Sequence, residues 1–236
     1  QEVGAQGGAK QQLVASDRGE ALAVFNSLNW ERVALAPLPA GYTGAVDGQG
    51  RALPTQAMGG TLWVEALVPP CGWTTVRPGP AAAPTGDVVY ATERSLENGL
   101  LRVTFDDRGE IASIYDKESK RELAAGPCNS FKMYKDVTTQ FDAWDIDSMY
   151  AQMPIALPEP VQIDVLAAGP LVAKLRLTRK LHHSRLTQVI SLRRGTCTLH
   201  GSGMIGLGTP PTEADGPCVR FEVMKFADTQ PHDLYL

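Results

Sequence analysis

The sequence predicts an all-β fold, an antiparallel β-sandwich of two packed sheets preceded by a short N-terminal helical or irregular tail. Short runs of alternating apolar and polar residues recur along the chain, and 23 Gly and 17 Pro among the 236 residues supply many turns between them. No long apolar stripe with the helical period of 3.6 residues is present. Many short strands without amphipathic helices favour two packed sheets over an α/β fold.

The first third of the chain begins with polar, glycine-containing residues, which predict at most a short helical turn around Lys10 to Ser16. Apolar and β-branched residues then alternate over 21–38, which predicts a strand, a turn and a second strand. Residues 61–68, T-L-W-V-E-A-L-V, predict another strand, ended by two prolines. The Pro/Ala/Gly-rich residues 78–86 predict a loop.

The clearest strand pattern is a meander that starts at Leu96. Apolar residues at 96–105 predict one strand, and D-D-R-G at 106–109 predicts a turn whose glycine takes a positive φ. Residues 111–115 return as the next strand, which the charged sequence 116–121 ends. Three further strands are predicted from alternating patterns, at 161–165, 171–177 and 186–192.

Charge and cysteine usage exclude several classes of protein. The formal net charge is −4, so the chain has no basic surplus with which to bind nucleic acid. No apolar run reaches the roughly 18 residues that a membrane span requires. The four cysteines are far apart and form no C-x-x-C pair. This spacing disfavours a zinc ribbon or a redox dithiol and favours a reducing, cytoplasmic compartment.

A cluster of carboxylates and aromatics is the candidate functional site. In the sequence F-D-A-W-D-I-D, Asp142, Asp145 and Asp147 lie around Trp144. Aromatic rings stack on the C–H face of a pyranose and carboxylates accept its hydroxyl protons, so these four residues are predicted to bind a sugar. A competing interpretation is that the carboxylates are solvated turn residues and that Trp144 anchors the loop to the core.

Three segments resemble one family. F-N-S-L-N-W-E-R (25–32), the meander from L-E-N-G-L-L to K-R-E-L (96–123), and N-S-F followed by F-D-A-W-D-I-D (129–147) are similar to the C-terminal half of glycoside hydrolase family 38 α-mannosidases, with the same order and spacing. The resemblance covers about residues 20–205. The family usually has Trp at the position of Phe141.

The resemblance implies a retaining exo-α-mannosidase whose nucleophilic Asp and zinc ligands lie in an N-terminal α/β domain, followed by a helical bundle and then β domains. It implies that residues 1–20 are a tail from the bundle and that 21–205 are the β-sandwich. Residues 206–236 depart from the pattern, and we expect a divergent tail that is disordered or read in a shifted frame. The family's His-x-Asp zinc motif is absent at all four histidines, His182, His183, His200 and His232.

We therefore predict no catalytic residue and no metal ligand in this chain, and no mannoside hydrolysis by the chain alone. Zinc or another divalent metal is implied only for the full-length enzyme. The expected role is to support the catalytic domain, which is a missing partner here, and to line the subsite for mannose-containing glycans with Asp142, Trp144, Asp145 and Asp147. Unpaired sheet edges also predict self-association.

Two alternatives stay open at this point. The chain is a stand-alone, non-catalytic carbohydrate-binding module if one sheet presents an exposed row of aromatic rings. It is a self-sufficient glycosidase if Asp142 acts with Asp145 or Asp147. The second alternative is disfavoured because neighbouring carboxylates in one loop seldom lie on opposite sides of a glycosidic bond.

Overall fold

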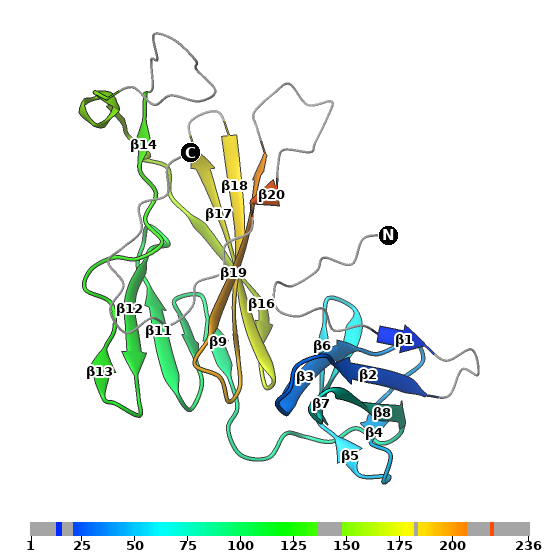
Figure 1. Ribbon diagram of the computed structural model, residues 1–236. Helices are drawn as coiled ribbons and strands as arrows, with labels where there is room; N and C mark the ends of the chain where they lie inside the picture. The colour runs from blue at the N-terminus through cyan, green and yellow to red at the C-terminus, as the bar shows by residue number, and fades with distance from the viewer. Residues whose placement is uncertain (1–12, 16–20, 136–147, 182–183, 207–217, 220–236) are drawn as a thin grey trace.

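The computed structural model describes residues 13–15, 21–135, 148–181, 184–206 and 218–219 (Figure 1). These residues form antiparallel strands and one 3-10 turn, η1 (Tyr150–Gln152), so the predicted all-β architecture is confirmed. Within them, no helix has the length and apolar character that a membrane crossing needs. The described part of the N-terminal tail is strand β1 (Leu13–Ala15) rather than a helical turn, because its backbone pairs along the open edge of β2 (Leu22–Asn26).

The first structural unit, called here the N-terminal sandwich, packs two small sheets. Their strand orders are β1-β2-β8-β4-β5 and β3-β7-β6. The alternation of residues 22–38 and 61–68 places valines and alanines between the sheets, where Val24, Val64, Val68 and Val76 are fully buried. The remaining strands of this unit are β3 (Arg32–Pro37), β4 (Ala45–Val46), β5 (Ala52–Leu53), β6 (Thr55–Met58), β7 (Thr61–Val68) and β8 (Gly72–Pro78).

The second unit, the C-terminal sandwich, packs sheet β13-β12-β11-β10-β9 against sheet β16-β17-β18-β19-β20. Leu96, Leu101 and Val103 from the first sheet meet Leu175 and Leu177 from the second in a fully buried core. Its strands are β9 (Tyr90–Thr92), β10 (Ser95–Glu97), β11 (Leu101–Phe105), β12 (Ile111–Asp116), β13 (Arg121–Glu122), β16 (Gln162–Ala168), β17 (Val172–Leu181), β18 (Ser184–Arg193), β19 (Leu199–Gly206) and β20 (Cys218–Val219).

The single strand predicted over 96–105 is two strands, β10 and β11, joined by a tight hairpin. Asn98 causes the reversal, since its Oδ1 accepts the backbone N–H of Leu101 (2.7 Å). Its Nδ2 donates to the carbonyl of Arg193 (2.7 Å), the last residue of β18 in the other sheet, and to the carbonyl of Thr196 (2.8 Å), in the connection that follows β18. Asn98 is only 2% exposed, so this one side chain both turns the hairpin and joins the two sheets.

A buried glutamine connects the two sandwiches. Gln56, on β6, is 6% exposed, and its Oε1 accepts the backbone N–H groups of Leu171 and Val172, each at 2.8 Å. Its Nε2 donates to the carbonyl of Val172, also at 2.8 Å. Met58 and the half-buried Trp63 pack beside these bonds. The backbone N–H and the carbonyl of Val172 thus both bond to the side chain of a residue 116 positions earlier in the chain.

An ion pair closes the same contact. Arg194 donates from Nε to Oε1 of Glu65 (2.8 Å) and from Nη2 to the same oxygen. Its Nη1 donates to the carbonyl of Thr85 (3.0 Å), in the connection between the sandwiches. We refer to the contact made by Gln56, Glu65 and Arg194 as the seam, and it holds the two units together at one end of β17 and β18.

Candidate functional site

The four predicted sugar-binding residues, Asp142, Trp144, Asp145 and Asp147, lie in the segment 136–147, outside the described residues. Their contacts and their role stay predictions. The chain on both sides of this segment, up to Lys135 and from Ser148, is described.

A short hairpin brackets the segment. Strand β14 (Met133–Tyr134) pairs antiparallel with β15 (Pro154–Ile155), and η1 precedes β15. The rings of Tyr134 and Tyr150 meet edge to face with centroids 5.3 Å apart. The chain before and after 136–147 is therefore fixed side by side. In Figure 1, β14 lies at the end of the C-terminal sandwich that is remote from strands β1 to β8.

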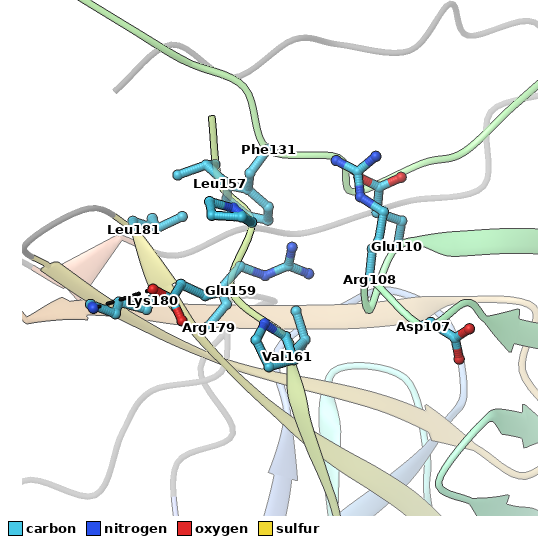
Figure 2. Close-up of a pocket in the computed structure, with 12 residues that line it drawn as sticks. Asp107, Arg108, Glu110, Phe131, Leu157, Glu159, Val161, Arg179, Lys180 and Leu181 are labelled. Atoms are coloured by element: carbon cyan, nitrogen blue, oxygen red, sulfur yellow. Dashed lines mark hydrogen bonds and ion pairs between the residues drawn. The ribbon is translucent and has the colours of Figure 1, made fainter. Parts of the chain in front are cut away.

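A pocket of about 360 Å³ lies at the foot of this hairpin (Figure 2). Its walls come from the turn around 107–110, the residues 157–161, the end of β17 at 179–181, and Phe131. Phe131 and Leu157 also pack on the buried side chains of Leu181 and Leu186, so they anchor the hairpin to β17 and β18. The pocket thus lies between the anchor of the hairpin and the edge of the sandwich.

Arg179 is the most buried cation in this pocket, with 7% of its surface exposed, and the carboxylate residue Glu110 is 5% exposed. Its Nη2 donates to the carbonyl of Gly109 (3.0 Å), and its guanidinium carbon lies 4.6 Å from the centre of the Phe131 ring. Burial lowers the pKa of Arg179, and the negative charges of Glu110 and Asp106 offset only part of that effect. Within the described residues, Nε is buried with no hydrogen-bond partner.

The turn beside Arg179 requires glycine. Gly109 has φ +68°, as the D-D-R-G sequence predicts, and its N–H donates to the carbonyl of Asp106 (3.0 Å). A Cβ at this position would lie 2.8 Å from Cγ1 of Val161 and 3.1 Å from Nη2 of Arg179. The absence of a side chain lets the Gly109 carbonyl approach the guanidinium, so the turn fixes how Arg179 points.

Arg179 was not among the predicted site residues, although the sequence contains a signal for it. Along β17, Leu175, Leu177 and Leu181 point into the core, and Arg179 occupies the same face by alternation. A charged residue at an inward position of a strand is rare unless it is paired or functional. The pattern L-x-L-x-R-x-L at 175–181 therefore marks this position.

No metal centre is formed by the described residues, in which no three His, Cys, Asp or Glu side chains come together as possible ligands. His200 lies on β19 opposite Ser191, within the sheet. His182 and His183 lie outside the described residues. The expectation that zinc belongs to another part of the full-length enzyme stays a prediction.

A second feature lies on the N-terminal sandwich. Phe25 on β2 and Trp73 on β8 are cross-strand partners, and their ring centroids are 6.0 Å apart with the planes tilted by 42°. Trp73 is 61% exposed and Phe25 is 36% exposed. The sequence does not indicate this exposed pair, because Trp73 lies outside the predicted strands and therefore has no predicted register with Phe25.

Comparison with known proteins identifies the region around the pocket. Residues 96–202 match the family described as "Glycosyl hydrolases family 38 C-terminal domain". The chain is similar to "Alpha-mannosidase 2C1" from Homo sapiens, with 30% identity over 167 residues, which cover 66% of this chain and 14% of that protein. The chain therefore corresponds to about a seventh of the length of this curated relative.

Two solved structures share the fold. A glycosyl hydrolase family 38 protein from Enterococcus faecalis superimposes with a TM-score of 0.56 at 11% identity, over 81% of this chain and 32% of that one. An alpha-mannosidase from Enterococcus faecalis V583 gives a TM-score of 0.54 at 10% identity, over 82% of this chain and 30% of that one. At these identities the likeness concerns the arrangement of strands alone.

Proposed function

We propose that this chain is the β region of a retaining α-mannosidase, because residues 96–202 match the glycosyl hydrolases family 38 C-terminal domain. In the intact enzyme it supports the catalytic domain and lines the sugar subsite. The observation that carries this proposal is the hairpin β14–β15, which holds both ends of the 136–147 segment on the sandwich. A loop that orients a substrate needs such a rigid base.

Asp142, Trp144, Asp145 and Asp147 then act on the substrate through this loop. Trp144 covers the apolar face of a terminal mannose, and the carboxylates accept hydrogen bonds from its hydroxyl groups. None of the four breaks the glycosidic bond, because the nucleophile belongs to the catalytic domain. Zinc or another divalent metal is bound by that domain and supplies charge stabilisation there.

The proposed enzyme is cytoplasmic. The three cysteines in the described residues, Cys71, Cys128 and Cys197, are free thiols. Burial, followed by the charge of Glu122, raises the pKa of Cys128. Its thiol is therefore protonated and unreactive at neutral pH, and three unpaired thiols suit a reducing compartment.

The experiment uses a full-length relative that carries Asn at the position aligned with Asp145. We expect kcat/KM for a nitrophenyl α-mannoside to fall by at least about tenfold, because one substrate hydroxyl loses a charged acceptor. The matched control is Gln at the position of Glu118, an exposed carboxylate in the turn after β12. Unchanged kinetics in the Asp145 variant would reject a substrate role. The 236-residue chain alone, with added zinc, should release no nitrophenol.

A second candidate function is supported by one observation, the exposed pair Phe25–Trp73. Two neighbouring rings on one sheet face can stack on a sugar, so a non-catalytic carbohydrate-binding role competes with the first proposal. Calorimetric titration of the chain with mannobiose tests it. Trp73→Ala should weaken binding by about tenfold, and Trp30→Ala, which removes another exposed ring, should not. Equal affinity in both variants removes this candidate.

A further inference from the structure

The pocket at the foot of the β14–β15 hairpin contains a cation that its carboxylates do not pair. In the described part of the chain, Asp107 pairs with Arg94 (2.6 Å), Glu110 with Arg108 (3.4 Å) and Glu159 with Lys180 (3.4 Å). Each of these three carboxylates thus forms its ion pair with a cation other than Arg179, although the charge of Glu110 also acts on Arg179. Among the described residues, the guanidinium of Arg179 makes one hydrogen bond, to the neutral carbonyl of Gly109.

The surroundings of Arg179 leave one edge of the guanidinium open. The Phe131 ring covers one face of the guanidinium plane, and the bond to Gly109 uses one N–H of Nη2. Figure 2 shows the guanidinium pointing into the space between Phe131 and the turn that bears Arg108 and Glu110. The N–H groups of Nη1 and the second N–H of Nη2 form a fork, which is the geometry that binds two oxygens of one anion.

The negative charges of Glu110 and Asp106 act on Arg179, but among the described residues neither carboxylate forms an ion pair with it, and burying a guanidinium without such direct contact is costly. A charge removed from water must be paired or hydrogen-bonded, and a single neutral acceptor recovers only part of its lost hydration. The lowered pKa of Arg179, caused first by burial, expresses the same penalty. An anion in the pocket would remove it.

We propose that this pocket is a binding site for one small anionic group, a carboxylate or a phosphate, held by the forked edge of Arg179. Phe131 and Leu157 form its apolar wall, and the cations Lys180 and Arg108 lie at its rim. The volume of about 360 Å³ admits a small metabolite, since ligand pockets begin at roughly 300 Å³. The site does not depend on mannosidase activity, so a negative result for one proposal leaves the other unaffected.

The test uses the whole 236-residue chain. Sodium acetate and sodium phosphate are titrated at constant ionic strength, and binding is followed by calorimetry and by the midpoint of thermal unfolding. Acetamide, which has the shape of acetate without its charge, is the reference. We expect saturable binding of at least one anion with a dissociation constant of about 1–10 mM and none of acetamide. The tighter anion identifies the ligand class.

Substitutions localise the binding. Arg179→Gln should abolish it and Arg179→Lys should weaken it by at least about tenfold, because an ammonium keeps the charge but lacks the fork. Arg176→Gln, which removes an exposed arginine of the same strand, should leave it unchanged. Leu157→Glu keeps Arg179 and brings a carboxylate to the pocket wall, so it should block the anion while the chain stays folded.

Two results would overturn the proposal. One is the absence of saturable binding for both anions up to about 50 mM, where a site with millimolar affinity is filled. The other is equal anion affinity in the native chain and in Arg179→Lys or Leu157→Glu. The Leu157 variant decides the matter even if removal of Arg179 unfolds the protein.

Discussion

Replacing Gln56 by Leu removes every hydrogen bond of the glutamine at the seam while leaving a side chain of similar size. Two backbone N–H groups, of Leu171 and Val172, and the carbonyl of Val172 lose their partner together. All three groups are buried. Leucine gains contact with Met58 and Trp63, which already form an apolar cluster at this place.

The magnitude follows from these opposing terms. A buried polar group left unsatisfied costs about 1–3 kcal/mol, so three such groups cost about 3–9 kcal/mol before relaxation. Burying a leucine side chain returns about 2 kcal/mol, and entry of a water recovers part of the rest. We expect Gln56→Leu to lower the free energy of unfolding by about 3 kcal/mol.

Urea unfolding, followed separately by tryptophan fluorescence and by circular dichroism, measures the effect. Three of the four tryptophans lie in the N-terminal sandwich, so fluorescence reports mainly on that unit. Loss of the seam should separate the two transitions, because the sandwiches then unfold independently. Gln162→Leu, which removes one exposed hydrogen bond from β16, is the control and should cost less than about 0.5 kcal/mol. A loss below about 1 kcal/mol with coincident transitions would refute the reasoning.

Three further changes test other parts of the structure. Asn98→Ala should lower the free energy of unfolding in urea by about 2 kcal/mol, because two carbonyls and two amides lose a buried partner; a loss under about 0.5 kcal/mol would contradict this role. Burial raises the pKa of Glu122, but hydrogen bonds from the Ser113 hydroxyl and from backbone amides outweigh it and hold the pKa below the ordinary value of a glutamate. The stability that the ionised Glu122 contributes is present above the ordinary Glu pKa and is lost as the pH falls through the lowered pKa. Glu122→Gln should therefore reduce the fall in the free energy of unfolding at acid pH. An unchanged dependence on pH would reject this role. Gly109 has φ +68°, and Gly109→Ala would place a Cβ 2.8 Å from a methyl group of Val161, so it should lower the free energy of unfolding, measured by thermal unfolding, by about 2–3 kcal/mol. The control is Gly86→Ala, at φ +80° with open space around the new Cβ, which should cost less. Equal losses in the two variants would show that the contact at Gly109 is relieved.

Local patterns predicted most of the strands of five or more residues, but few of the shorter ones. The run 61–68 is β7 to the residue, and the D-D-R-G turn forms where the sequence places it. The strand at 96–105 was predicted as one because its apolar alternation outweighed the Asn98-Gly99 pair, which is itself a hairpin signal. β8 was missed because Gly72 and two threonines dilute its apolar pattern.

Contacts between distant segments could not be predicted. Gln56 looks like an ordinary polar residue of a short strand, and nothing near it indicates a partner 116 residues away. The same holds for Phe25 and Trp73, whose pairing depends on the register of β2 with β8. Arg179 could be predicted in part. The alternation along β17 indicates that its side chain points inward, but it does not indicate the pocket that the side chain enters. For the candidate sugar site, the family resemblance is supported, while the roles of Asp142 and its neighbours await experiment.

Strand β17 begins at the seam, where Gln56 holds Val172, and ends at the pocket, where Arg179 lies. Its ten residues extend over about 33 Å. Slippage of the strand by a single position would turn each of its side chains to the opposite face and would present Lys180 to the pocket in place of Arg179. A change at the seam that shifted the register of β17 would therefore alter the pocket at the far end of this strand, without contact with any residue of the pocket.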